Sequence, residues 1–339
     1  MINNLRYFKG SFFVTLIGLS VAFMLGGLKA MMIASILSVL EVSLSFDNAV
    51  VNATVLRTMD VKWRRRFITW GILIAVFGMR IVFPLLIVGI AAHLGPIETL
   101  MMAIYKPEDY ERYLVSSHLS VAGFGGAFLM MVFLKFFFDE EKDVHWIKII
   151  EAPLIKLGKI EAFEILITIF SIYFITSYLS YHGKYEFFSA GVMGVVTYIA
   201  VDGFGAFMES TEKKMAGQVA KAGLASFLYL ELLDASFSFD GVIGAFALTN
   251  NLFIITIGLG IGAMFVRSLT IMLVENGALE SYLYLEHGAF YAIGVLASIM
   301  FLGTLYEISE VITGLIGAGF IGIALISSIL YNRTKQALN

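Results

Sequence analysis

The chain has 339 residues and a mean hydropathy of +0.87, with 59% hydrophobic and only 14% charged residues. Soluble domains carry about 25% charged residues, so this composition indicates a protein that crosses a membrane several times. The absence of cysteine excludes disulfides, thiolate metal sites and thiol redox chemistry. The formal net charge of −3 points to no particular partner. We expect the lipid bilayer but no nucleic acid among the partners, and the sequence does not set the oligomeric state.

The apolar segments are long enough for membrane-spanning helices and too long for the alternating strands of a β-barrel. The first segment, within 1–27, follows basic residues but lacks a small-residue cleavage site, so we interpret it as a span and not as a signal peptide. We therefore predict an all-α transmembrane bundle of about ten spans, at 11–28, 30–57, 67–92, 118–138, 162–180, 187–208, 218–248, 252–274, 287–304 and 308–331.

Two polar connections interrupt this series. Residues 93–117 are expected to form a short surface helix, and the charged segment 139–160 separates two halves. The fifth span, 162–180, fits the end of the first half as well as the start of the second. We predict one acidic motif in each half, with these boundaries: 1–160 with the motif at 41–48, and 161–339 with the motif at 231–240.

The placement of basic residues predicts the orientation of the chain. With a cytoplasmic N-terminus and ten alternating spans, 16 of the 23 Lys and Arg residues fall in inside segments and 4 in outside segments. Positive residues favour the cytoplasmic side of a membrane. We expect the bacterial inner membrane, with both termini in the cytoplasm.

The two acidic motifs are copies of each other. The segment SVLEVSLSFDNAVVNATVL at 38–56 aligns with ELLDASFSFDGVIGAFALT at 231–249, which matches Asp47 with Asp240 and Glu41 with Asp234. Weaker matches follow in the same order along both halves: Thr69 with Thr256, Gly71 with Gly258, Arg80 with Arg267, His118 with His287, Glu161 with Glu307 and Glu164 with Glu310. Two repeats of five helices have opposite polarity in the membrane, as in many secondary transporters.

Helical spacing gathers oxygen-bearing side chains around the two aspartates. In unbroken helices Asp47 and Asp240 would each lie about 15 Å from a span end, at the middle of a roughly 30 Å core. Carboxylate and amide oxygens without thiolates suit Mg²⁺, Ca²⁺ and Mn²⁺. We expect two facing polar stripes, formed by Glu41, Ser45, Asn48 and Asn52 in the first half and by Glu231, Asp234 and Ser238 in the second.

The motifs LEVSLSFDNAVV and ELLDASFSFDGVIGAFAL resemble the paired acidic motifs of TerC-type membrane proteins, within the LysE-like transporter superfamily. GILIAVFGMR at 71–80 and YLYLEHGAFYAI at 282–293 resemble that family and a related branch of it. The resemblance implies a manganese exporter or a metal-stress protein, some members being named for tellurium resistance. It implies that Asp47, Asn48 and Asp240 are metal ligands, with Glu41, Glu231 and Asp234 in support. Gly241 stands where the family commonly has Ser.

Other polar residues within or beside the spans leave alternatives open. Asp202 either completes the cation site or pairs with Arg80 or Arg267. Both arginines are interpreted as structural. His118 and His287 stand at span entrances, where a capping role is favoured over a gate or a pH sensor.

The expected function is export of a divalent cation, with Mn²⁺ first and Ca²⁺ or Mg²⁺ as alternatives, in exchange for protons and without a permanent cofactor. One alternative is a transporter of another small solute such as an amino acid, which Arg80 and Arg267 lining the site would favour. Another is a non-transporting scaffold for metal-stress proteins. We expect no enzyme, because Asp47 and Asp240 each follow Ser-Phe and lack the GxGD signature of intramembrane aspartyl proteases.

Overall fold

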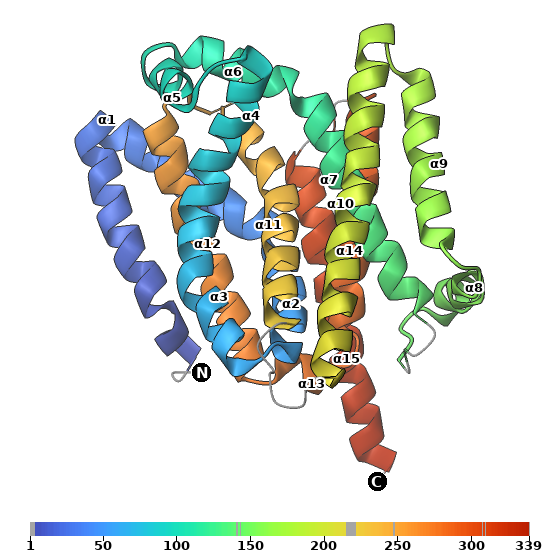
Figure 1. Ribbon diagram of the computed structural model, residues 1–339. Helices are drawn as coiled ribbons and strands as arrows, with labels where there is room; N and C mark the ends of the chain where they lie inside the picture. The colour runs from blue at the N-terminus through green and yellow to red at the C-terminus, as the bar shows by residue number, and fades with distance from the viewer. Residues whose placement is uncertain are drawn as a thin grey trace.

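The computed structural model describes residues 4–139, 142, 144–214, 222–246, 248–306, 308 and 310–338. Within these ranges some helical side chains lie outside the description, among them those of 72–73, 75–76, 205–214 and 237–240. The described chain is all-helical, which confirms the predicted fold class (Figure 1). Its elements are η1 (Asn4–Phe8), α1 (Lys9–Leu44), α2 (Phe46–Thr58), α3 (Val61–Leu73), the π-helix η2 (Ile74–Val82), α4 (Phe83–Ala92), α5 (Pro96–Tyr105), α6 (Pro107–Ser116), α7 (His118–Phe138), α8 (Lys148–Gly158), α9 (Phe163–Tyr178), α10 (Tyr181–Lys214), α11 (Ala222–Phe246), α12 (Leu252–Glu275), α13 (Ala278–Ser281), α14 (Leu285–Leu302) and α15 (Glu310–Leu338).

Each of the ten predicted ranges contains helix among its described residues, but fewer helices satisfy the length and apolarity of a membrane span. Six do so among the described residues, and up to eight if each of two bent helix pairs counts as one span. α2 is too short on its own, with 13 residues. The structure therefore supports a membrane protein of six to eight candidate spans, and the number ten remains a prediction.

α1 folds back on itself at a glycine pair. Gly27 has φ +65° and ψ −158°, a conformation that only glycine adopts readily, and Gly26 beside it is also non-helical. Figure 1 shows the resulting bend, from which one leg returns to the chain start and the other crosses behind the bundle toward α2. The predicted spans 11–28 and 30–57 thus correspond to the two legs, the second of which continues into α2.

The connections predicted to be polar contain short helices. The segment 93–117 forms two helices, α5 and α6, where one was expected, and α5 turns by 102° from the end of α4. The segment 139–160 contains α8, which meets α9 at 106°. Figure 1 shows α5, α6 and the α1 bend at one end of the bundle, with α8, α13, the α2–α3 connection and both chain ends at the other.

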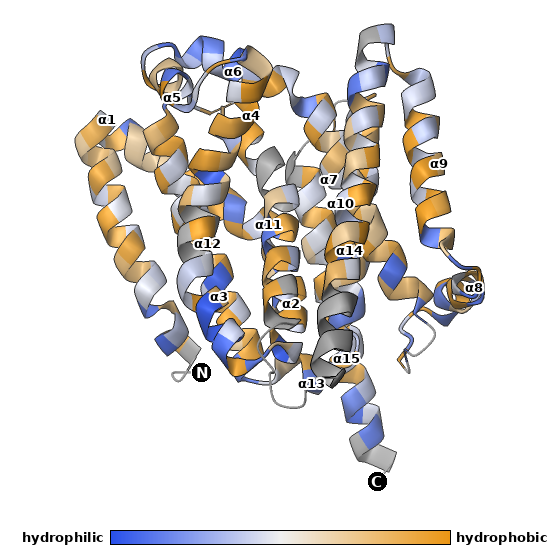
Figure 2. Ribbon diagram, in the orientation of Figure 1, coloured by the Kyte–Doolittle hydropathy of each residue, from blue (hydrophilic) through white to orange (hydrophobic). Residues whose placement is uncertain are grey.

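The exterior of the bundle is apolar. Figure 2 shows hydrophobic residues along α1 and α9, while hydrophilic residues gather on the lower part of α3 and at the end of α15. Large side chains are exposed on these helices, including Met24 and Phe170. In water such surfaces would aggregate, whereas lipid chains cover them without penalty, so they support a membrane location.

Candidate functional site

The first acidic motif spans the end of α1 and the start of α2, and the second lies on α11, which packs against both helices. α1 ends at Leu44, and Ser45 leaves the helical conformation with φ −104° and ψ 19° before α2 begins at Phe46. The helix is therefore interrupted within the first motif. Such irregular backbone at membrane depth is tolerated where it is buried in protein or lines a cavity.

A small cavity of about 40 Å³ lies where α2, α3, η2, α11 and α12 meet. A space of this size holds a single ion or a few water molecules. Its lining includes side chains from both predicted polar stripes, together with both arginines of the repeat. The lining residues are Ser45, Asn48, Asn52, Phe67, Gly71, Arg80, Asp234, Ala263, Val266, Arg267 and Thr270.

A buried ion pair closes one side of the cavity. Arg80 Nη2 donates to Glu41 Oε1, and Ser45 Oγ donates to the same oxygen at 3.0 Å. Arg80 is positioned by the π-helix η2, a local widening that is common at functional sites. Since only 2% of Glu41 is exposed, its charge is compensated by this guanidinium and not by water. The other oxygen, Oε2, lies 3.3 Å from the position that a Cβ would take at Gly241 on α11.

The opposite side carries the equivalent pair of the second half. Asn52 Nδ2 donates to Asp234 Oδ1 at 3.1 Å, which joins the two motifs directly across α2 and α11. Arg267 lines the cavity beside Asp234 and donates from Nη1 to the Phe67 carbonyl at 3.3 Å. Asp234 and Arg267 thus occupy the positions that match Glu41 and Arg80 in the first half.

Several buried oxygens here lack a hydrogen-bond donor. These are the amide oxygens of Asn48 and Asn52 and both carboxylate oxygens of Glu231. Glu231 Oε1 lies 3.5 Å from the position of a Cβ on the lining residue Gly71, so this carboxylate is next to the cavity. An unsatisfied buried acceptor costs about 1–3 kcal/mol, and a cation or ordered water in the cavity would remove that cost.

Asp47 and the adjacent Asn48 face different parts of the structure: Asn48 lines the cavity, whereas Asp47 does not. It is buried in the first turn of α2, and its Oδ1 accepts from the Asn48 backbone N–H at 3.0 Å. A carboxylate in this position is favoured by the helix dipole. Its Oδ2 lies 3.4 Å from the position of a Cβ on Gly317, so Asp47 faces the glycine-rich face of α15 and does not line the cavity.

The remaining predicted site residues are placed as follows. Asp240 lies on α11, but its side chain is outside the described part of the chain, as is that of Ser238. Asp202 is exposed on α10 and does not line the cavity. Arg80 pairs with Glu41, so Asp202 is not needed to compensate that arginine.

No dense group of metal-binding side chains is present in the described residues. No three or more His, Asp or Glu side chains lie close enough together there to hold a metal ion. The cavity instead combines carboxylate and amide oxygens with two guanidinium groups. The sequence predicted the oxygen ligands but interpreted the arginines as structural. Each motif is followed by one arginine in the next helix, 33 residues after Asp47 and 27 residues after Asp240, which was the signal that both could reach the same site.

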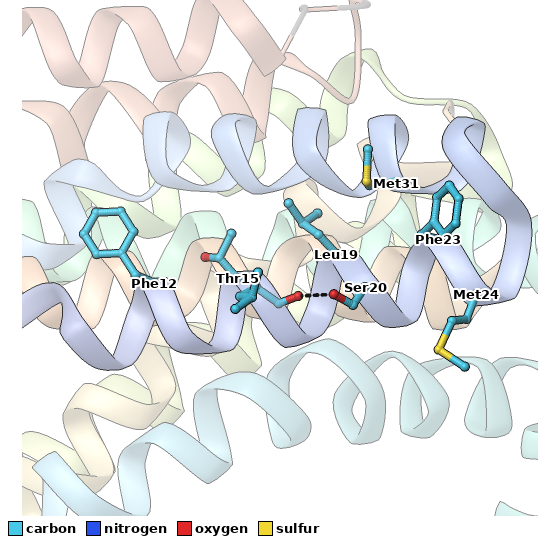
Figure 3. A pocket seen from close by; sticks show the side chains of 8 residues that line it. Phe12, Thr15, Leu19, Ser20, Phe23, Met24 and Met31 are labelled. Carbon is cyan, nitrogen blue, oxygen red and sulfur yellow. Dashed lines mark hydrogen bonds between the residues drawn. The ribbon is translucent and has the colours of Figure 1, made fainter.

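Of the other hollows on the described surface, one of about 540 Å³ lies beside the start of α3 and is lined mainly by charged side chains, among them Asp60, Lys62, Arg65 and Arg66. Two further hollows are apolar. One of about 650 Å³ lies between α4 and α5, and another of about 560 Å³ lies along the two legs of α1 (Figure 3). In the second, the hydroxyls of Thr15 and Ser20 donate to backbone carbonyls of their own helix. With no ionisable group and no free donor, this groove suits lipid chains and not a polar substrate.

The two histidines of the repeat have different surroundings. His118 is half-buried at the start of α7, whereas only 3% of His287 is exposed at the start of α14. His287 Nε2 lies 2.8 Å from the Val144 carbonyl oxygen and 3.6 Å from a carboxylate oxygen of Glu151. The predicted capping role therefore fits His287, with a partner on α8 that the sequence did not suggest.

Comparison with known families gives a match over most of the chain. Residues 46–335 match the family DUF475, described as a protein of unknown function. The chain belongs to the DUF475 family. The matched region runs from the start of α2 into α15 and includes Asn48, Asn52 and Asp234. No curated protein and no solved structure matches the chain.

Proposed function

We propose that this DUF475 protein is a divalent cation transporter related to the TerC-type exporters, with Mn²⁺ as the first candidate and protons as the counter-ion. The observation that supports this most directly is the set of buried oxygens without donors around a cavity of about 40 Å³. Oxygen ligands from Asn48, Asn52, Asp234 and Glu231 suit a hard cation. The resemblance adds Asp47 and Asp240 as ligands.

The charges around the cavity leave room for a cation. Arg80 is bound to Glu41, which leaves the single positive charge of Arg267 for the two carboxylates of α11, Glu231 and Asp234. One carboxylate of Glu231 and Asp234 then remains without a counter-charge. A buried carboxylate in that state either binds a cation or takes up a proton, which is the competition that proton-coupled exchange requires.

The helix contacts support the inverted-repeat arrangement within this proposal. Three pairs of helices that the repeat makes equivalent touch each other: α2 with α11, η2 with α12, and α7 with α14. A two-fold axis between the halves brings equivalent helices together in this way. The common position of both chain ends beside the basic α2–α3 connection supports cytoplasmic termini in an inner membrane (Figure 1).

The arginines favour a second candidate, a transporter of a small solute with its own carboxylate, such as an amino acid. Arg80 and Arg267 both line the cavity, and Nη2 of Arg267 is buried without a hydrogen-bond partner. The volume opposes this candidate, because pockets for small organic ligands are typically about 300–1,000 Å³. A single ion is therefore the better fit.

Equilibrium binding separates the two candidates. Purified protein in nanodiscs is titrated with Mn²⁺, and in parallel with amino acids, by calorimetry. We expect Mn²⁺ binding that Asn52→Leu and Asp234→Asn each weaken at least tenfold, because each change removes an oxygen ligand or its orienting partner. Glu275→Gln, a carboxylate-to-amide change at the exposed end of α12, is the matched control and should bind as wild type. Binding of an amino acid but not of Mn²⁺, lost on changing Arg267, would replace the cation proposal with the second candidate.

A further inference from the structure

A second buried polar cluster lies outside the cavity, where the connection after α7 packs against the start of α14. Its centre is Glu151 on α8, whose side chain is completely buried. Oε1 of Glu151 accepts from the backbone N–H groups of Trp146 and Ile147 at 3.2 and 3.0 Å, and from the Tyr291 hydroxyl at 3.3 Å. This carboxylate therefore joins the connecting segment to α14, a helix 140 residues further along the chain.

The second oxygen of Glu151 is surrounded by three nitrogens. Lys142 Nζ, His145 Nδ1 and His287 Nε2 lie 3.6, 3.5 and 3.6 Å from Oε2. None of these is a hydrogen bond, and Oε2 has no donor. His287 Nε2 lies 2.8 Å from the Val144 carbonyl oxygen, which can only accept, so the proton of the neutral ring is on Nε2 and the buried Nδ1 has no partner.

Charge in this cluster is finely balanced. With Glu151 ionised and Lys142 protonated, the cluster is neutral while both histidines are neutral. Burial lowers the pKa of Lys142 against the opposing effect of Glu151, which shows that positive charge is disfavoured here. A proton on the buried His287 would add a second cation beside the first. The other charged or titratable groups facing the cluster are Asp139, Tyr284, Glu286 and Tyr291.

The cluster also connects to the helix that carries the first acidic motif. Glu286, next to His287 at the start of α14, lies 3.9 Å from Arg57 at the end of α2. Asn48 and Asn52 are on the same helix α2. If the connecting segment moved away from α14, it would therefore disturb the contact between the start of α14 and the C-terminal end of α2.

We propose that Glu151, Lys142, His145 and His287 form a proton-sensitive latch, which holds Lys142 and residues 144–158 against α14 when His287 is neutral and releases them when it is protonated. We call these four residues the Glu151 latch. This regulatory device goes beyond the proposed transport and does not depend on it.

The direction of the pH effect follows from the charge balance. The closed latch favours a neutral His287 ring, because a buried cation there would lie beside Lys142, so the stability of the latch is present at neutral pH. That stability is lost as the pH falls through and below the ordinary histidine value of about 6.5. Acidification therefore opens the latch, and raising the pH closes it.

Trp146 reports on the latch directly, because it lies 5.8 Å from Tyr291 and 6.4 Å from Tyr284 between ring centroids. The other two tryptophans, Trp63 and Trp70, are on α3. In a Trp63→Phe, Trp70→Phe background, we expect Trp146 emission to shift to the red as the pH falls from 8 to 5. Adding His145→Gln and His287→Gln should abolish this red shift, so that the emission stays constant over that range. The control change His118→Gln on α7 should leave the red shift as it is. A constant emission with the histidines present, or an unchanged transition without them, would overturn the latch.

A second measurement keeps the test independent of tryptophan replacement. The chain has no cysteine, so Ile147→Cys introduces a single thiol in the partly buried part of the segment. Its labelling rate by a maleimide is divided by that of Lys156→Cys, which is exposed on α8, to remove the pH dependence of thiol reactivity. We expect this ratio to rise several-fold between pH 8 and 5. A ratio independent of pH would contradict release of the segment.

Discussion

Two arginines determine how the carboxylates around the cavity behave. Glu41 and Asp234 are aligned positions of the two acidic motifs; Arg80 pairs with Glu41, and Arg267 lines the cavity together with Asp234. An uncompensated charge in this environment costs several kcal/mol, so the arginines allow carboxylates to remain ionised where water is excluded. The price is a weaker electrostatic attraction for a bound cation than a purely acidic cage would have.

Replacing Arg80 with Leu should strongly destabilise the protein. The change leaves Glu41 buried without its counter-charge, which typically costs about 3–5 kcal/mol. The double change Glu41→Gln, Arg80→Leu should recover a large part of that loss, because it removes both charges. Thermal unfolding of the single and double variants in the same detergent measures the coupling. If the loss of stability in the double variant equalled the sum of the losses in Glu41→Gln and Arg80→Leu alone, the ion pair would contribute nothing to stability.

At this scale the sequence predicted the oxygen-bearing residues but not all of their contacts. Helical spacing correctly brought Ser45, Asn48 and Asn52 to one side of the chain, because the period of a helix survives the break at Ser45. The hydrogen bond between Asn52 and Asp234 depends on how two helices from different halves pack, which no local pattern encodes. Glu151 was missed for the same reason, since its partners come from a loop and from α14.

At the scale of elements, the second leg of α1 and α12 approach each other through glycine. A Cβ at Gly262 would lie 2.5 Å from Glu41 Cβ and 2.9 Å from the Ser38 carbonyl oxygen. Gly258, one turn earlier, has an equally close neighbour in Leu37. Small residues spaced by four permit such close packing in membranes, and here the packing fixes the position of Glu41.

Gly262→Ala should therefore lower stability, by about 1–3 kcal/mol if the backbones separate to accommodate the methyl group. Gly319→Ala on α15 is the control, because a Cβ there meets nothing within 4 Å. The difference between the melting temperatures of the two variants measures the effect. Equal melting temperatures would mean that α1 and α12 can move apart without cost.

The elements that the sequence predicted least well are the interrupted ones. The range 30–57 reads as one apolar helix, yet the chain breaks at Ser45, and the π-helix η2 lies within the predicted span 67–92. Hydrophobic periodicity is insensitive to a single displaced turn, so it cannot locate such breaks. The bend at Gly27 was closer to a prediction, since the first proposed span ended at residue 28, next to the bend.

For the whole molecule, composition was enough to predict a membrane protein, and the length of the apolar segments was enough to predict that it is all-helical. The number of spans was harder to predict. Charged groups inside the bundle and bent helix pairs make individual helices fall short of a span by length and apolarity. These buried charges are also the feature from which a transport function is inferred.

Transport in proteoliposomes tests the central claim most directly. Vesicles with a trapped Mn²⁺-sensitive dye and an imposed pH gradient would compare the wild type with Asp47→Asn plus Asp240→Asn and with the control Glu275→Gln. We predict Mn²⁺ flux that requires the gradient, persists in the control and is lost in the double variant. Folded wild-type protein that moves none of Mn²⁺, Ca²⁺ and Mg²⁺, or a double variant that transports as well as the wild type, would contradict a cation pathway between the two acidic motifs.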